Sequence, residues 1–119
     1  MTQLEQQVVA TQRAPLLEEQ LLPIHVPHDE IRRFCHQNHI RKLSWLGSVL
    51  RDDFTAESDI DVLVEFEPGK TPGFAIVKMQ TELSQLLDGR IVDLRTPKEL
   101  SPYIREQILL KALGEYEKN

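Results

Sequence analysis

Residues 47–66 read GSVLRDDFTAESDIDVLVEF, and this stretch contains a β-strand with an unusual pair of aspartates at its start. Side chains alternate between the two faces of a strand, so residues 60–66 should present one apolar face and one acidic face. The apolar face comprises Ile60, Val62, Val64 and Phe66, and the other face comprises Asp59, Asp61, Leu63 and Glu65. Two aspartates on one face repel each other, which lowers stability unless a counter-charge such as a divalent cation lies beside them.

The composition indicates one globular domain. A chain of 119 residues, 40% of them hydrophobic and 28% charged, can bury one ordinary core but not two sizeable ones. The formal net charge of -5 argues against direct binding to nucleic acid, which usually needs a basic surface. Cys35 is the only cysteine, which excludes a disulfide framework. No apolar run approaches the ~20 residues of a membrane span, and the first residues do not resemble a secretory signal, so we expect a cytoplasmic protein with no membrane partner.

The N-terminal residues differ in composition from the rest of the chain. Residues 1–26 are rich in glutamine, with scattered leucines and with prolines at positions 15 and 23. Pro15 could begin a short helix, because proline is favoured at the first helical position. We therefore expect residues 1–26 to form an extension, helical in part, that binds a partner or is mobile. Residues 27–119 should form the domain itself.

From Pro27 onward, the spacing of apolar residues predicts both helices and strands. Helices are expected from residue 27 to about residue 38, from residue 74 to a stop at Gly89, and from Ser101 onward. Strands are expected over 43–46, 60–66 and 90–94. A capping box is predicted at Thr96, Pro97 and Glu99. The inward side of the last helix should consist of Ile104, Ile108, Leu109, Ala112 and Leu113. This order predicts the α/β (α+β) class, a small mixed sheet with helices packed against it.

The third expected strand contributes another carboxylate. Val92 and Leu94 belong to one face of that strand, so Asp93 falls on the other. If this strand lies beside residues 60–66, Asp93 joins Asp59 and Asp61 on a common surface. Three carboxylates there would form a magnesium site, because Mg²⁺ prefers oxygen ligands and shares them with waters and substrate phosphates. Two such ions, roughly 3.5–4 Å apart, can support an in-line displacement at phosphorus.

The start of the stretch predicts a phosphate-binding turn. Gly47 and Ser48 directly follow a strand and open a helical turn, where backbone N–H groups and the serine hydroxyl could reach a phosphate at close range. Arg51, one turn further on, could pair with the same phosphates. Ser48 could also simply cap the turn, and Arg51 could be an ordinary surface charge.

Taken together, these motifs resemble a known family. Gly47-Ser48, a spacer over residues 49–58, Asp59-Ile60-Asp61 and the later Val92-Asp93-Leu94 look like the DNA polymerase β-type nucleotidyltransferase superfamily. The longer strings GSVLRDDFTAESDIDVLVEF and VDLRTPKELSPYIREQIL resemble more narrowly the minimal nucleotidyltransferase (MNT) proteins of prokaryotes, over roughly residues 40–113. The resemblance implies a nucleotidyltransferase fold and an enzyme that transfers AMP from ATP and releases pyrophosphate.

The resemblance also implies roles for individual residues. Asp59 and Asp61 would hold two Mg²⁺ ions, with Mn²⁺ as an alternative, and Asp93 would ligate one ion and help activate the acceptor hydroxyl. Gly47 and Ser48 would hold the triphosphate of ATP, and Arg51 would contact the nucleotide. One departure from the family pattern concerns Asp52, an acidic residue where small residues are frequent, which sets a negative charge beside Arg51.

A chain of this size has little room for a surface that holds an acceptor, so we expect the acceptor to come from a partner. MNT proteins pair with HEPN-domain toxins, which are RNases, and some of them modify a tyrosine of the toxin with AMP. The resemblance therefore implies a hetero-oligomer with such a toxin, in which this chain is the antitoxin.

Other functions remain open from the sequence. The chain could neutralise its partner by binding alone, although a pure binder would have no physical reason to keep a repulsive carboxylate cluster. It could also modify a small hydroxylated molecule such as an aminoglycoside, although the small domain argues against this. A zinc site at Cys35, His36 and His39 is disfavoured, because cysteine on an apolar helical face usually belongs to the core.

Overall fold

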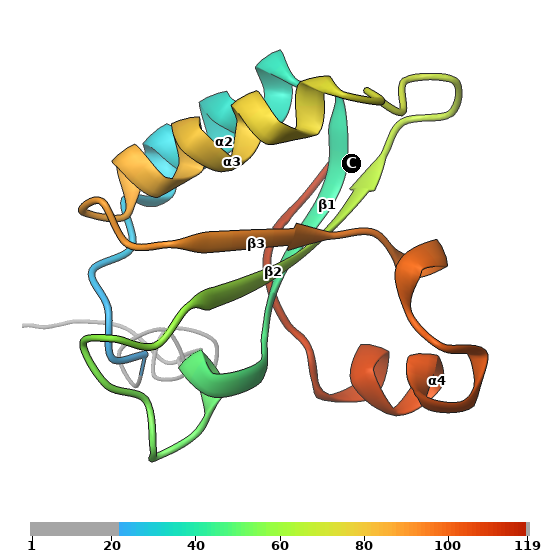
Figure 1. The fold of residues 1–119 in the computed structure, drawn as a ribbon. Helices are drawn as coiled ribbons and strands as arrows, with labels where there is room; N and C mark the ends of the chain where they lie inside the picture. Colours follow the sequence, from blue (N-terminus) through green and yellow to red (C-terminus); the bar gives the residue numbers. More distant parts are fainter. Residues whose placement is uncertain (1–21, 119) are drawn as a thin grey trace, which may run out of the picture.

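The computed structural model describes residues 22–118, which form a mixed sheet with helices on both of its faces (Figure 1). The elements are α2 (His28–Gln37), β1 (Ile40–Leu46), the short 3₁₀ helix η1 (Gly47–Leu50), β2 (Ile60–Phe66), α3 (Ala75–Leu86), β3 (Val92–Arg95), the 3₁₀ turn η2 (Pro97–Glu99), α4 (Pro102–Lys111) and β4 (Leu113–Glu117). The fold class predicted from the sequence is confirmed.

The strands lie in the order β3-β2-β1-β4. β1 pairs antiparallel with both β2 and β4, whereas β2 and β3 run parallel. The parallel pair is possible because α3 forms the crossover connection that parallel neighbours require. The second and third expected strands therefore lie side by side, which is the condition stated above for Asp93 to share a surface with Asp61.

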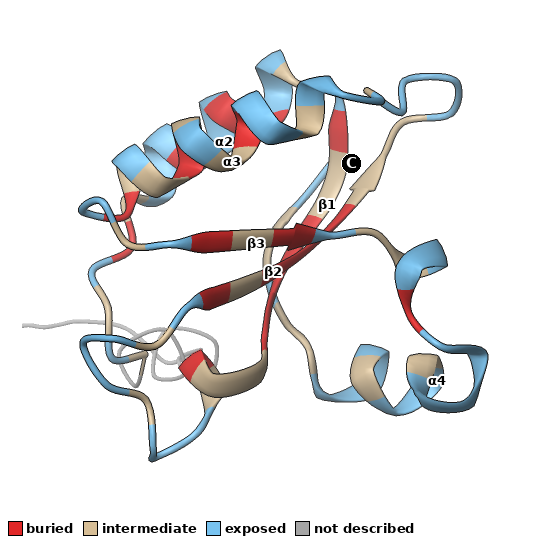
Figure 2. Cartoon of the chain, viewed as in Figure 1, coloured by how far each residue is buried: buried red, intermediate tan, exposed pale blue. Residues whose placement is uncertain are grey.

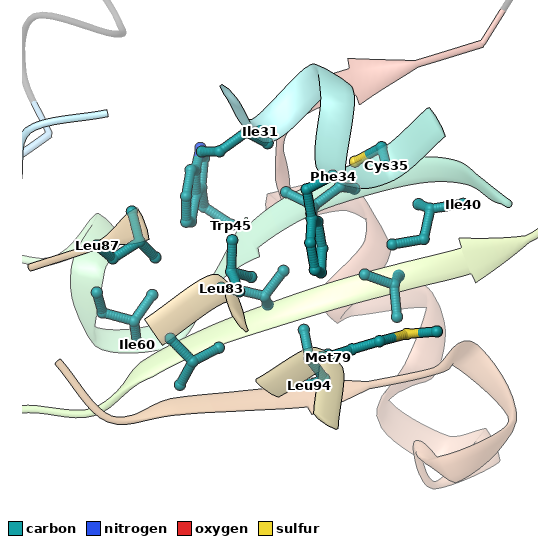
Figure 3. Packing of buried hydrophobic residues seen from close by; sticks show 14 of the residues in the cluster. Ile31, Phe34, Cys35, Ile40, Trp45, Ile60, Met79, Leu83, Leu87 and Leu94 are labelled. Atoms are coloured by element: carbon teal, nitrogen blue, oxygen red, sulfur yellow. The ribbon is translucent and has the colours of Figure 1, made fainter. Parts of the chain in front are cut away.

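One face of the sheet carries the main hydrophobic core (Figures 1 and 3). Helices α2 and α3 lie side by side over this face. α2 contributes Ile31, Phe34 and Cys35, which recur at helical spacing, and its first turn carries the acidic residues that the helix dipole favours. The sheet and α3 complete the core with a set of fully or nearly fully buried side chains: Leu43, Trp45, Ile60, Val62, Val64, Met79, Leu83 and Leu94.

The opposite face of the sheet is covered only in part. A small second cluster consists of Leu46, Leu63 and Leu100, with Ile108 and Ala112 of α4 packed against it. Figure 2 shows α4 coloured as exposed or half-buried along its whole length, in contrast to the buried stripes of the other two helices. Much of this second face is therefore free to carry polar side chains.

Two predictions about the end of the chain are wrong. The last helix ends at Lys111, and Leu113 begins the edge strand β4, which was not predicted. Of the side chains expected to point inward, Ile104 and Leu109 are instead 46% and 42% exposed. The reason is that α4 packs against the sheet-face cluster through Ile108 and Ala112 near its C-terminal end, and its other apolar side chains are spread around the helix. The predicted start of the last helix at Ser101 and the capping box at Thr96 and Glu99 are confirmed, and the Ser101 side chain accepts a hydrogen bond from the amide of Tyr103.

Smaller differences concern element bounds. β1 begins three residues before the expected position, and the third strand covers Val92–Arg95 instead of 90–94. The expected extension of residues 1–26 lies mostly outside the described residues, but Leu22, Ile24 and Val26 pack against the main core. Among the helices of residues 22–118, none combines the length and apolar character needed to cross a membrane.

Candidate active site

The candidate site lies on the partly covered face of the sheet, where β1, β2 and β3 come together. In the parallel register of β2 and β3, Asp61 is the partner of Asp93. In the antiparallel register of β1 and β2, Asp61 is also the partner of Leu46, the residue directly before Gly47. Strand pairing therefore places the Gly47 turn and both carboxylates beside one another, although they are far apart in the sequence.

Gly47 allows the turn to approach Asp61 closely. Its φ is +66°, in the left-handed region that side chains with a Cβ rarely adopt. A Cβ atom at this position would lie 2.7 Å from Oδ2 of Asp61. Both the backbone conformation and the available space therefore require glycine here, and the glycine is what lets the carboxylate lie directly against the turn.

Ser48 connects this turn to the start of β2. Its hydroxyl donates a hydrogen bond of 3.2 Å to the backbone carbonyl of Asp59. The predicted helical turn after Gly47 exists as η1, a single turn of 3₁₀ helix. Ser48 thus fixes the position of Asp59 relative to Gly47, and its hydroxyl lies between the two predicted halves of the site.

Burial raises the pKa of the Asp61 carboxyl above its ordinary value of 3.8, and the negative charge of Asp93 adds to this rise. Arg95 acts in the opposite direction, Asp59 raises the pKa further, and Arg51 lowers it. Asp61 is therefore the carboxylate on which the other charged groups of the site converge. The raised pKa means that the charged form of Asp61 is disfavoured in the folded state, first by burial and then by the neighbouring carboxylates.

The carboxylate of Asp93 is partly neutralised by Arg95, two residues further along the same strand. Arg95 donates to Oδ2 of Asp93 from Nη2 at 2.8 Å and from Nε at 3.2 Å. In the part of the chain that the structure describes, no three acidic, histidine or cysteine side chains converge closely enough to hold a metal ion. Carboxylate oxygens are ligands that suit Mg²⁺, and both Asp59 and Asp93 lie near enough to Asp61 to act on its charge. To ligate an ion, Asp93 would have to exchange Arg95 for it.

A pocket of about 420 Å³ opens beside Gly47 and is lined by Leu46, Gly47, Leu50, Arg51, Ile108 and Lys111. A neighbouring pocket of about 690 Å³ shares Leu50, Arg51 and Lys111 with it. Volumes of this order suit small-molecule ligands. The walls combine apolar side chains with two cations, Arg51 and Lys111, and the larger pocket also contains the acidic Asp52.

One predicted residue, Arg51, is only loosely attached to the site, and one residue that lines the pockets, Lys111, was not predicted. Arg51 is exposed, and its Nε lies 3.4 Å from Oδ1 of Asp53, so it is not held in place by the rest of the site. Lys111 lines both pockets but was not predicted, because a lysine at the end of a helix has an ordinary structural explanation in the helix dipole. The sequence carried no signal that would have distinguished it.

Cys35 belongs to the core, as predicted. Burial raises the pKa of its thiol to about 12, with a further contribution from the charge of Glu115. His36 and His39 are exposed. A thiol with so high a pKa is a poor metal ligand, since metals bind the thiolate.

Comparison with known proteins gives a consistent result. The sequence profile of a family described as "Nucleotidyltransferase domain" matches residues 28–113. The "Putative protein adenylyltransferase MJ0435" of Methanocaldococcus jannaschii is 35% identical over 74 residues, which cover 62% of this chain and 77% of that protein.

Two solved structures resemble the fold. One, described as a "putative minimal nucleotidyltransferase", has a TM-score of 0.61 at 31% identity and covers 72% of this chain and 86% of its own. The other is a toxin–antitoxin crystallised with AMP-PNP, with a TM-score of 0.64 at 19% identity, covering 79% of this chain and 76% of its own. At that identity the second similarity supports the fold alone.

Proposed function

Because the chain belongs to the nucleotidyltransferase domain family, we propose that it transfers AMP from ATP to a hydroxyl group of a partner protein. The proposed partner is a HEPN-type toxin, and the proposed acceptor is a tyrosine of that toxin. Transfer of AMP would neutralise the toxin, so that the chain acts as the antitoxin of the pair.

One observation carries the chemical part of this proposal. The parallel register of β2 and β3 sets Asp61 beside Asp93, while Gly47 brings the start of η1 against the same carboxylate. The carboxylate cluster would bind a cation, and the turn next to it would bind the phosphates that are coordinated to the same cation. Neither feature helps the fold, because the cluster is repulsive and the turn requires a left-handed conformation.

The proposed reaction is an in-line displacement at the α-phosphorus of ATP. The tyrosine oxygen forms the new bond to phosphorus, the bond from phosphorus to the bridging oxygen of the β-phosphate breaks, and pyrophosphate leaves. The hydroxyl proton is released as the oxygen attacks, and Asp93 is the proposed group that assists its removal. Gly47 and Ser48 would hold the triphosphate, and Arg51 would neutralise part of its charge.

The proposed cofactor is a pair of Mg²⁺ ions, which Mn²⁺ could replace. Asp59 and Asp61 would hold both ions and Asp93 one of them. When bound, the ions would offset the negative charge that develops on the phosphoryl oxygens and the leaving group. The role of the chain is to fix the three carboxylates, and both Asp59 and Asp93 act electrostatically on Asp61.

The proposed partner is supported by the relatives and by the size of the domain. The similar protein of Methanocaldococcus jannaschii is named as a protein adenylyltransferase, and one structural neighbour is a toxin–antitoxin. The described residues form one sheet with three α-helices, and the pocket beside Gly47 is lined by a few residues of β1, η1, α4 and Arg51. A partner protein would supply the missing acceptor surface.

The proposal is tested with the purified chain and its co-expressed partner. Incubation with ATP and magnesium should add the mass of one or more AMP groups to the partner, on tyrosine, with release of pyrophosphate, and EDTA should stop the reaction. Mass spectrometry that shows transfer of phosphate, or no modification under conditions that keep the complex intact, would contradict it.

A second candidate function is neutralisation by binding alone. The observation in its favour is the Arg95–Asp93 ion pair, which occupies one of the three proposed metal ligands. If Asp61→Asn abolishes AMP transfer in vitro but the variant still protects cells fully from the toxin, binding and not transfer is the function.

A further inference from the structure

We propose that Arg90 is a positioning residue of the active site, which holds the loop before β2 so that Asp59 is kept in place. The inference rests on the proposed function, because Asp59 is one of its metal ligands. Arg90 itself contacts neither Asp59 nor Asp61 by any interaction that the structure records for residues 22–118. Its contacts are with the loop that leads to Asp59.

The loop in question connects η1 to β2 and covers residues 51–59. Most of its residues are exposed, and it contains neither helix nor strand. Its own hydrogen bonds are local: the amide of Ser58 donates to the carbonyl of Thr55 at 3.1 Å, and the amide of Thr55 donates to Oγ of Ser58 at 3.0 Å. Asp59, at the end of the loop, is held at its carbonyl by the Ser48 hydroxyl of η1. The other bonds shape a turn, but they do not connect that turn to the sheet.

Arg90 supplies that connection. Its Nη2 donates to the carbonyl of Thr55 at 2.7 Å and approaches the carbonyl of Ser58 at 3.3 Å. The carbon of its guanidinium lies 4.5 Å from the centre of the Phe54 ring, in a cation–π contact. One side chain therefore binds three residues of the loop, the last of them directly before Asp59.

The backbone of Arg90 is itself firmly held. Its carbonyl accepts a hydrogen bond of 2.6 Å from the Ser84 hydroxyl of α3, and its amide donates to the carbonyl of Leu87 at 3.3 Å. Leu87 is buried in the main core. Figure 1 shows that α3 leads through a short turn into β3, so Arg90 links the core helix and the active-site strand to the loop. The adjacent residue, Ile91, accepts the first hydrogen bond of β2, from Ile60.

The charge of Arg90 is directed at backbone carbonyls and an aromatic ring. The arginines that act on the Asp61 carboxyl are Arg95 and Arg51. Within residues 22–118, Nε of Arg90 is buried and makes no hydrogen bond, so the guanidinium is held by Nη2 and by Phe54. The geometry of the planar group is therefore what matters, and a lysine could reproduce only part of it.

The first test measures the loop in the free protein, without metal or nucleotide. In Arg90→Met, amide hydrogen exchange at Thr55 and Ser58 should be at least ~10-fold faster than in the wild type, whereas exchange at Val62 and Val64 in the centre of β2 should be unchanged. Arg33→Met, which alters a surface arginine of α2, is the matched control and should leave the loop amides unchanged. Unchanged exchange at Thr55 and Ser58, or equal acceleration in β2, would overturn the proposal.

The second test measures transfer of AMP to the partner. Arg90→Met should lower the rate at least ~10-fold at low magnesium and recover most of it at high magnesium, because a misplaced ligand weakens metal binding more than it changes the chemistry. Arg90→Lys should fall between Arg90→Met and the wild type. Full activity of Arg90→Lys, or a loss that magnesium does not reduce, would contradict positioning by the planar group.

If Arg90→Met fails to fold, Phe54→Leu keeps the guanidinium and removes only its aromatic contact. In Phe54→Leu, the loop amides should exchange faster than in the wild type, by less than the ~10-fold expected for Arg90→Met. Exchange at the wild-type rate would overturn the proposal. A wild-type chain that transfers no AMP would overturn the proposed function, while the exchange experiment would still decide whether Arg90 orders the loop.

Discussion

The two faces of the sheet have opposite chemistry, although they are built from alternate residues of the same strands. On one face, Val62 and Val64 are fully buried beneath α2 and α3. On the other, Asp61 lies between Asp93 and the Gly47 turn, with only a small apolar cluster nearby. The first face stabilises the fold through burial of apolar area. The second face lowers the stability of the fold, because negative charges lie close together on it.

This contrast separates residues that hold the fold from residues that perform the chemistry. If it is correct, substitutions on the core face should change the free energy of unfolding and leave the transfer rate per folded molecule unchanged. Substitutions on the acidic face should do the reverse. The following predictions compare the two faces directly.

The largest effect on stability should come from Leu83→Ala on the core face. Leu83 is fully buried between α3 and the sheet, so its truncation should lower the free energy of unfolding by about 2–5 kcal/mol. Leu110→Ala, at an 81% exposed position on α4, is the control and should change it by less than ~0.5 kcal/mol. Urea unfolding measures both, and equal effects would show that the assignment of the core is wrong.

The largest effect on transfer should come from Asp61→Asn on the acidic face. Loss of this carboxylate should lower AMP transfer at least ~100-fold, equivalent to about 2.7 kcal/mol of transition-state stabilisation. Asp59→Asn should have a similar effect. Glu65→Gln is a matched control from the same strand, since Glu65 pairs with Arg41 away from the cluster. A comparable loss in that control would mean that general charge, and not the cluster, supports transfer.

A smaller effect is expected when the Gly47 turn is altered. Gly47→Ala and Gly69→Ala both force alanine into positive φ, at +66° and +76°, and each should cost about 1–2 kcal/mol of stability. Only at Gly47 would the added Cβ meet Asp61, whereas nothing lies within 4 Å of it at Gly69. Transfer should therefore fall about 10-fold or more in the first variant and stay unchanged in the second. Equal activity in the two would contradict the close approach of turn and carboxylate.

The smallest effect concerns stability as a function of pH. The folded-state pKa of Asp61 is raised above 3.8, so the folded state loses stability as pH rises from 3.8 through that raised pKa. Asp61→Asn should therefore be more stable than the wild type at pH 7, by at most about 1 kcal/mol because the carboxyl is partly exposed.

The difference between the two proteins should shrink as pH is lowered through the raised pKa and below 3.8, where the wild-type carboxyl is protonated in both the folded and the unfolded state. Urea unfolding at several pH values measures this. A variant that is less stable than the wild type at pH 7 would show that Asp61 contributes to folding, contrary to the contrast between the two faces.

Much of the site-bearing part of the fold could be predicted from the sequence. The alternation over residues 60–66 predicts both faces of β2, and the glycine that follows β1 predicts a turn that only glycine can form. Asp93 could be joined to Asp61 because neighbouring strands with buried alternate residues must share a core face. These features are local or follow from strand period, and sequence patterns report such features well.

The features that could not be predicted depend on contacts between distant residues. β4 is short and half-exposed. Because Leu113 also continues the apolar spacing of α4, the sequence pattern predicted a longer helix in place of the strand. Arg90 contacts a loop more than thirty residues earlier in the chain, and nothing in its local sequence indicates this contact. The Arg95–Asp93 pair was likewise visible only once side-chain positions were known.

The most direct test of the central claim, that the acidic face exists to bind metal and nucleotide, is thermal unfolding with and without both ligands. Saturating magnesium with ATP should raise the melting temperature of the wild type by at least ~5 °C, because the ligands bind only the folded state. The same addition should leave Asp61→Asn almost unchanged, although that variant should melt no lower than the wild type without ligands. An equal shift in both proteins, or no shift in the wild type, would contradict the account.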